Sequence, residues 1–391
     1  MAQQRIPATV ITGFLGAGKT TLIRNLLQMV DGDRLALIIN EFGDIGVDAA
    51  LTKECGAPSC DADSIIELAN GCICCTVADD FLPSMEALLN QTPPPDRIII
   101  ETSGLALPQP LVQAFQWPDI RTRAMLDGVI TVVDGPALAK DQVASDLAAV
   151  ENQRQNDPEL DHDTPINELF HDQLSAANIL VLSKTDMMSD ADKQNVKAKL
   201  GRMMTQNAPI VETTATSAPL SALFGLGLEA EAFQRSAHTL HDHHHEHDDH
   251  DHDDDHDHDH DHDHNHDDDH HHHHHHHHHG HDHGHDHGHD AFQTVILSIP
   301  PLDTAEQVVD AIKELAEPGG MLRAKGFLTV TGKRAPLVVQ AVGSRVEHYY
   351  TPAGSAMPTD DNAGHGRLVV IGHAGMDVDT LAKRTGGSIT G

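Results

Sequence analysis

A glycine-rich loop near the N-terminus constrains this chain of 391 residues more than any other feature. The loop, Gly13-Phe-Leu-Gly-Ala-Gly-Lys-Thr20, follows an apolar run over Ala8–Thr12 and precedes a helical pattern over Thr20–Val30. A strand, a loop with this glycine spacing and a helix form the phosphate-binding loop of nucleotide-hydrolysing domains. The glycines let backbone N–H groups approach phosphate oxygens, and the start of the helix favours negative charge. The loop therefore predicts an α/β domain that binds a nucleotide.

The polar residues of this loop and of a later strand have expected roles. Lys19 would place its charge at the β- and γ-phosphates, and the Thr20 hydroxyl would ligate Mg²⁺. Glu101 ends an apolar run and precedes Gly104 by three residues, a spacing that suits a magnesium-binding acid and a γ-phosphate contact. Asp134 is the competing acid. The expected phosphate-binding residues are Gly13, Gly16, Ala17, Gly18, Lys19, Thr20 and Thr21, with Lys19, Glu101 and Gly104 also acting in hydrolysis.

The sequence Ser183-Lys-Thr-Asp186 follows another apolar run and indicates the base that is bound. A carboxylate such as Asp186 can accept both N1–H and N2–H of guanine, which adenine does not offer. Lys184 and Asp186 are therefore expected to bind GTP, although Ser183 stands where such loops usually have Asn and reaches less far. No residue is recognisable as a strong water-activating group, which predicts slow GTP hydrolysis by the isolated protein.

The order of apolar runs and helical patterns predicts three regions. Residues 1–235 are expected to form a doubly wound, mostly parallel α/β domain. Residues 236–290, almost without apolar side chains, are expected to be a disordered His/Asp-rich linker. Residues 291–391 are expected to form a small α/β or α+β domain. The strands expected in the first region are Ala8–Thr12, Leu35–Ile39, Ile65–Leu68, Arg97–Ile100, Val129–Val133, Ile179–Leu182 and Pro209–Glu212.

The linker dominates the composition. It holds 29 of the 34 histidines, and its 18 acidic residues leave the rest of the chain with 42 acidic and 25 basic residues, a net charge of −17. That balance excludes nucleic acid and anionic membranes as partners, since both require a basic face. Neutral imidazoles bind transition metals, so the linker is either a metal buffer, weakened below about pH 6.5, or a solvated spacer.

Three thiols within four positions, Cys72, Cys74 and Cys75, form a second motif. Thiolates favour Zn²⁺, Co²⁺ and Cu(I), and three protein ligands leave one tetrahedral position open for transfer of the ion. Buried small cysteines or a redox pair are the alternatives. Cys55 and Cys60 are either auxiliary ligands or incidental. An odd number of cysteines and no basic leader indicate a cytoplasmic protein in a reducing compartment.

These motifs together resemble those of the CobW family of P-loop GTPases, often called metal chaperones. The resemblance rests on the phosphate-binding loop, on Glu101-Thr-Ser-Gly104 and Ser183-Lys-Thr-Asp186, and on four further segments. These are Asn40-Glu-Phe-Gly43, Gly71-Cys-Ile-Cys-Cys75, Leu322-Arg-Ala-Lys-Gly-Phe327 and Gln340-Ala-Val-Gly-Ser-Arg-Val346.

The resemblance implies a Mg²⁺·GTP-dependent carrier that supplies Co²⁺ to cobalamin synthesis, with cobaltochelatase as the acceptor protein. It implies that Asn40–Gly43 is a switch and that Glu41 links the nucleotide to a metal site formed with Cys72, Cys74 and Cys75. A zinc carrier of the same family, a nitrile hydratase insertase and a His-rich metal storage protein remain alternatives, and homodimerisation stays open.

Overall fold

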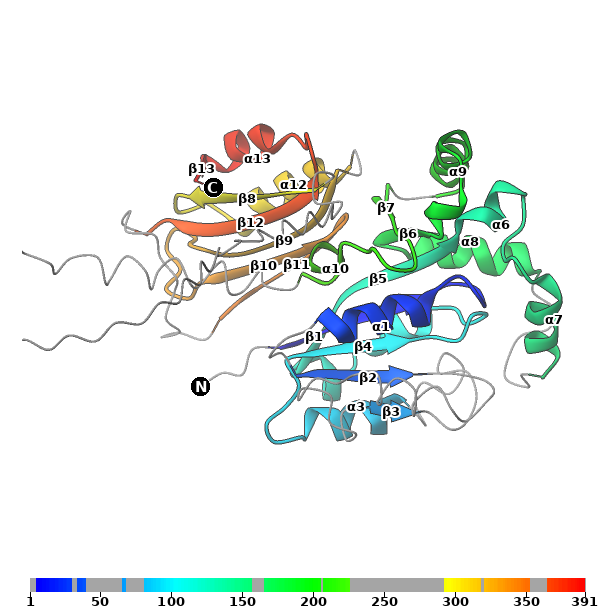
Figure 1. Ribbon diagram of the computed structural model, residues 1–391. Helices are drawn as coiled ribbons and strands as arrows, with labels where there is room; N and C mark the ends of the chain where they lie inside the picture. Colours follow the sequence, from blue (N-terminus) through cyan, green and yellow to red (C-terminus); the bar gives the residue numbers. More distant parts are fainter. Residues whose placement is uncertain are drawn as a thin grey trace, which may run out of the picture.

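Two sheets, each with its own helices, make up the described part of the chain (Figure 1). This computed structural model describes residues 5–29, 34–39, 81–156, 165–204, 207–225, 292–317, 320–351 and 364–390, and the backbone of 65–67. The doubly wound parallel domain and the separate C-terminal domain predicted from the sequence are confirmed. The domain boundaries predicted near residues 235 and 290, and the linker predicted to be disordered, lie outside the described residues.

The first sheet has seven strands in the order β3-β2-β4-β1-β5-β6-β7, and every neighbouring pair is parallel. The strand order changes direction at β1, since β2, β3 and β4 were added on one side of it and β5, β6 and β7 on the other. Ligands bind at such a switch point. The strands are β1 (Ile6–Thr12), β2 (Leu35–Ile39), β3 (Ile65–Glu67), β4 (Arg97–Glu101), β5 (Ala124–Asp134), β6 (Ile179–Ser183) and β7 (Ile210–Glu212).

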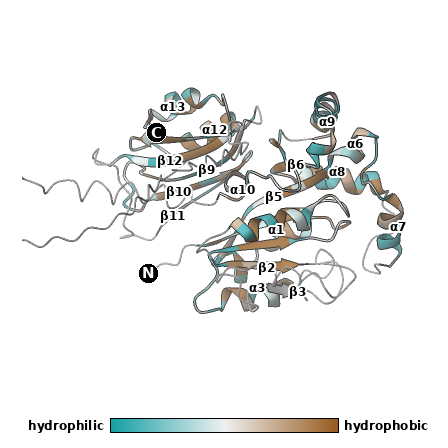
Figure 2. Ribbon diagram, in the orientation of Figure 1, coloured by the Kyte–Doolittle hydropathy of each residue, from teal (hydrophilic) through white to brown (hydrophobic). Residues whose placement is uncertain are grey.

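Helices cover both faces of this sheet, which explains why most residues of its strands are apolar (Figure 2). In β2, Leu37 belongs to the core cluster formed with α1, whereas Ile38 belongs to the cluster formed with α3.

Among the described residues, no helix is long and apolar enough to cross a membrane. The helices are α1 (Lys19–Met29), α3 (Leu82–Leu89), α4 (Gln109–Ala114), α5 (Pro118–Arg121), α6 (Gly135–Ala139), α7 (Leu147–Asn156), α8 (Ile166–Ala176), the 3₁₀ turn η3 (Thr185–Met187), α9 (Asp190–Met203) and α10 (Leu220–Phe224).

The second sheet is antiparallel, with the order β11-β10-β9-β12-β8-β13. Helices α12 (Ala305–Ala316) and α13 (Val378–Thr385) pack on one face. The other face joins the core of the first domain, where Leu322 and Val342 pack with Leu223 of α10. The strands are β8 (Phe292–Ile299), β9 (Met321–Leu328), β10 (Leu337–Val342), β11 (Arg345–Tyr350), β12 (Gly366–His373) and β13 (Ser388–Ile389).

A buried ion cluster joins the two sheets. Oδ2 of Asp127, in β5, lies 2.5 Å from Nη1 of Arg323 in β9 and 3.2 Å from Nη1 of Arg97 in β4. The Arg323 guanidinium also donates through Nε to the Leu223 carbonyl at 2.8 Å. Burial raises the pKa of Asp127, but the charges of Arg323 and Arg97 outweigh it and hold that pKa below its ordinary value. The two sheets also pack closely at the next residue, Gly128, where a Cβ would lie 2.8 Å from Cγ1 of Val342 in β10.

Removal of the Asp127 carboxylate should destabilise the protein strongly, because Arg323 and Arg97 would stay buried without a counter-charge. We expect Asp127→Ala to lower the free energy of unfolding by about 3–5 kcal/mol, measured by urea unfolding at pH 7. The pKa of Asp127 is lower in the folded protein than in the unfolded chain. The stabilisation that Asp127 provides is therefore complete above the unfolded pKa of about 3.9, and it is lost as the pH falls through the lower pKa of the folded state.

Asp96→Ala is the matched control, because Asp96 pairs with Arg34 at the surface, where both side chains are more than two-fifths exposed. Such a pair contributes no more than about 1 kcal/mol. Equal, small losses in the two variants would contradict the structural role given to Asp127.

Candidate nucleotide-binding site

The phosphate-binding loop lies at the carboxyl end of β1 and turns directly into α1. Gly13 has φ 138°, and a Cβ there would lie 2.3 Å from the Val132 carbonyl oxygen of β5, so only glycine fits. The turn is closed by the Ala17 N–H, which donates to the Phe14 carbonyl at 3.0 Å. The loop therefore takes the compact form that leaves its N–H groups for an anion.

Lys19 folds back over this loop. Its Nζ donates to the Gly13 carbonyl at 2.8 Å, and the side chain is buried. Ser183 also contacts the loop, because its Oγ lies 2.6 Å from the Ala17 carbonyl oxygen and 3.0 Å from that of Val133. The short reach noted for Ser183 in the sequence is thus sufficient to join the loop after β6 to the phosphate-binding loop.

Thr20 and Glu101 meet at the level where β1 and β4 end. Ile11 pairs with Glu101 in the sheet, and the Thr20 hydroxyl donates to Oε1 of Glu101 at 3.4 Å. A hydroxyl and a carboxylate are the hard oxygen ligands that Mg²⁺ prefers. These two residues therefore fit a magnesium ion, with Thr20 as a direct ligand and Glu101 beside it.

Asp134, the competing acid, is engaged elsewhere. Its Oδ2 accepts from Lys184 Nζ and from Ser145 Oγ, both at 2.6 Å, and its Oδ1 accepts from the Ala137 N–H at the start of α6. Burial raises the pKa of Asp134, but these hydrogen bonds outweigh it and hold the pKa below its ordinary value. Asp134 thus anchors Lys184, and the structure places Glu101, not Asp134, next to Thr20.

Gly104 packs directly against the phosphate-binding loop. A Cβ on it would lie 2.7 Å from the Leu15 backbone nitrogen, so any larger residue would push the two loops apart. Gln173 of α8 fixes the segment from Gly104 to Ala106. Its Nε2 donates to the carbonyls of Gly104 at 3.0 Å and Ala106 at 3.2 Å. The backbone carbonyl of Gln173 in turn accepts from Thr131 of β5.

Two adjoining cavities surround the loop. The phosphate cavity, of about 270 Å³, is lined by residues of the loop, by Glu101 to Gly104 and by Gln153 of α7. The base cavity, of about 150 Å³, lies between α1, β6 and η3. Gly18, Thr21 and Lys184 line both cavities, so an extended ligand can occupy the two together.

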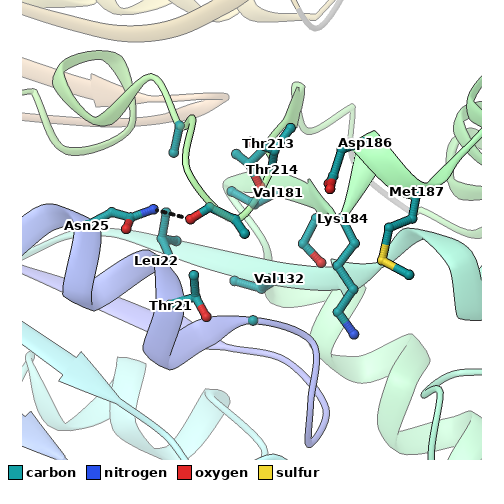
Figure 3. A pocket seen from close by; sticks show the side chains of 14 residues that line it. Thr21, Leu22, Asn25, Val132, Val181, Lys184, Asp186, Met187, Thr213 and Thr214 are labelled. Atoms are coloured by element: carbon teal, nitrogen blue, oxygen red, sulfur yellow. Dashed lines mark hydrogen bonds between the residues drawn. The ribbon is translucent and has the colours of Figure 1, made fainter. Parts of the chain in front are cut away.

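The base cavity has apolar walls and a carboxylate at its mouth (Figure 3). Leu22, Val132 and Val181 line it, and the exposed Asp186 lies across it from α1. Lys184 takes φ 58°, which turns the chain sharply into η3. A planar base between apolar walls with its polar edge toward Asp186 would satisfy this arrangement.

Comparison with known proteins assigns the chain to a family. The family model "CobW/HypB/UreG, nucleotide-binding domain" matches residues 7–212, more than half of the chain, and "Cobalamin synthesis protein cobW C-terminal domain" matches residues 293–385. The chain belongs to the CobW family.

Relatives within this family match along the whole chain. A protein of Sinorhizobium sp. named "Zinc chaperone CobW" is 44% identical over 377 residues, which cover 96% of this chain and 95% of that one. A protein of the same name from Pseudomonas aeruginosa is 39% identical over 97% of this chain and 90% of its own length. The crystal structure of Zn(II)-bound YjiA GTPase from Escherichia coli is 20% identical, covers 98% of this chain and 99% of its own, and aligns with a TM-score of 0.34.

The thiol site expected for a CobW-family protein lies in a part of the chain that is not described. Glu41, Cys72, Cys74 and Cys75 all fall there, as do Cys55 and Cys60. Within the described ranges, no group of three or more His, Cys, Asp or Glu is arranged to hold a metal ion. The metal ligands therefore stay predictions.

Three polar residues of the site were not found from the sequence: Gln173, Ser145 and Gln153. Gln173 had a recognisable signal, because it shares the buried face of α8 with Leu169 and Phe170, where a polar side chain needs a partner. Ser145 and Gln153 had none, since their partners, Asp134 and Ser103, lie 11 and 50 residues away and belong to other elements.

Asp186→Asn should exchange the base preference of the site. The amide can accept only one of the two guanine N–H groups, so we expect GTP affinity to fall about 10- to 100-fold. Affinity for XTP should rise, since xanthine offers a carbonyl oxygen to the new amide. Titrations with fluorescent GTP and XTP analogues measure both changes. Asp190→Asn, exposed in the first turn of α9, is the control, and unchanged GTP affinity in Asp186→Asn would refute the role of Asp186.

Proposed function

We propose that this protein is a GTP-dependent metallochaperone that binds a divalent transition metal at Cys72, Cys74 and Cys75 and releases it under control of the nucleotide. The observation that carries the proposal is the register of the first sheet. Ile39, the last residue of β2, pairs with both Glu67, the last of β3, and Glu101, the last of β4. The phosphate cavity and the segments that lead to Glu41 and to the thiols therefore begin at one edge.

Chain connectivity keeps the two sites close. Glu41 follows the end of β2 by two residues, and Cys72 follows the end of β3 by five. A segment of five residues spans at most about 18 Å, even when it is fully extended. Cys72, the first of the three thiols, is thus tied by a short segment to the sheet edge at which the γ-phosphate would be bound.

The nucleotide is GTP, and the reaction is its hydrolysis to GDP and phosphate. Lys19 would neutralise the β- and γ-phosphates, and the Gly104 N–H would contact the γ-phosphate. Thr20, with Glu101 beside it, would hold Mg²⁺, which supplies charge neutralisation at the phosphates. Asp186 would select guanine. Hydrolysis by the isolated protein is expected to be slow and to accelerate when the acceptor protein binds.

Zinc is the cargo that the relatives favour, because the proteins from Sinorhizobium and Pseudomonas are both named zinc chaperones. Cobalt, ranked first from the sequence, is the second candidate. It is supported by the match of residues 293–385 to the C-terminal domain of a cobalamin synthesis protein, and its acceptor would be cobaltochelatase. Three thiolates suit both ions and leave one coordination position open for transfer.

Nucleotide state would gate the metal through the segments after β2, β3 and β4. With Mg²⁺·GTP bound, contacts to the γ-phosphate order these segments and complete the thiolate site. Hydrolysis removes those contacts and weakens the site while the acceptor is docked. The His/Asp-rich linker would concentrate metal for the thiols in the cytoplasm, and the chain would act as a monomer or a homodimer.

Anaerobic titration of the full chain with Co²⁺, with and without Mg²⁺ and a non-hydrolysable GTP analogue, tests this gating. Thiolate-to-cobalt charge-transfer absorption reports the cysteines alone, because imidazole ligands of the linker do not produce it. We expect the Co²⁺ affinity read from this band to rise by at least about fivefold with the nucleotide, which is a coupling of about 1 kcal/mol. The band should be lost in Cys74→Ser, and competition with Zn²⁺ should remove it if zinc is the preferred cargo.

Equal binding of Co²⁺ with and without the nucleotide would contradict the gating. Cys60→Ser is the matched control for Cys74→Ser, because Cys60 is a thiol outside the three-cysteine motif.

A further inference from the structure

Helix α7 brings an amide side chain to the phosphate cavity. Gln153 lines this cavity together with Lys19, Thr20 and Gly104, although about fifty residues separate it from the Gly104 loop. Its Nε2 lies 3.4 Å from the hydroxyl of Ser103, the residue before Gly104. Its Oε1 is buried and accepts no hydrogen bond in the described structure.

Burying an amide oxygen without a hydrogen-bond donor costs free energy. Oε1 of Gln153 is therefore expected to accept a hydrogen bond from a group that enters the cavity. Polar side chains such as those of Thr20 and Ser103 line the cavity, which is of a size to admit water beside a phosphate. Other groups at the cavity are already engaged, since Glu101 accepts from Thr20 and Lys184 donates to Asp134. Gln153 is thus placed to accept from a water molecule that enters between α7 and the γ-phosphate.

We propose that Gln153 positions the water that attacks the γ-phosphate of GTP, an inference that rests on the GTPase activity proposed above. The water donates to Oε1, and Nε2 is free to turn from Ser103 toward a γ-phosphate oxygen. The water oxygen forms a bond to the γ-phosphorus while the bond to the bridging oxygen breaks, and that electron pair stays on GDP. The water proton passes to the phosphate, because an amide is too weak a base to keep it.

This role explains how the chain can hydrolyse GTP without a strong base. An amide orients the nucleophile but does not deprotonate it, so it lowers the barrier by positioning alone. Slow hydrolysis follows in the isolated protein, and an acceptor that contacts α7 could set the rate through this one side chain.

Gln153→Met tests the proposal, because methionine keeps the length of the side chain and the helical preference of the position. The control is Gln155→Met on the same helix, where Gln155 is exposed and donates to Glu151 on the helix surface. We expect the single-turnover rate of GTP hydrolysis in the full chain to fall by at least about tenfold in Gln153→Met and to stay unchanged in Gln155→Met.

Affinity separates a positioning role from a structural one. Gln153→Met should bind a non-hydrolysable GTP analogue like the wild type but should lose affinity for Mg²⁺·GDP·aluminium fluoride, which mimics the transferring phosphoryl group. Equal losses for both ligands would overturn the proposal in favour of a structural role. A full hydrolysis rate in Gln153→Met would overturn it outright, and no hydrolysis by the wild type would refute the proposed GTPase and this inference together.

Discussion

The parallel pairing of β2, β3, β4 and β1 is the constraint on which the rest of the site depends. Parallel strands end at the same edge, so the loop after β1 and the acid that ends β4 are brought within hydrogen-bonding distance. The same pairing makes β2 and β3 end level with β4. The segments that carry Glu41 and the three thiols therefore begin at the same sheet edge as the phosphate-binding residues.

Strand β5 links this edge to the second domain. At one end Asp127 holds Arg323 of β9, and at the other Asp134 holds Lys184 beside the base cavity. The seven steps along the extended strand from Asp127 to Asp134 span about 23 Å. One rigid element thus fixes both the C-terminal sheet and the base-binding loop, which gives the second domain a physical connection to the nucleotide site.

The fold was largely predictable because burial on both faces leaves uninterrupted apolar runs, such as Leu35–Ile39, and glycines mark the loop after β1. Prediction failed where a charge is buried. The start of β5 was missed because Asp127 and Gly128 interrupt its apolar run, and Arg323, one of the two cations that pair with Asp127, lies 196 residues away. The edge strand β11 carries no long apolar run, because none of its residues is buried. Of the site, the loop motifs were recognisable, and the buried face of α8 marks Gln173, whereas Gln153 acts through a contact that no local pattern encodes. Cobalt was ranked above zinc from the family resemblance alone, because thiolates accept both ions and do not decide between them.

Reciprocal coupling between metal and nucleotide tests the central claim most directly, because a gate that lets GTP tighten metal binding must let metal tighten GTP binding by the same factor. The measurement is the Kd of a fluorescent, non-hydrolysable GTP analogue with Mg²⁺, with and without one equivalent of Zn²⁺, for the wild type and Cys74→Ser. The account predicts that Zn²⁺ lowers the Kd by at least about fivefold in the wild type and leaves it unchanged in Cys74→Ser. An identical Kd with and without Zn²⁺ in the wild type would show that the two sites are independent and would contradict it.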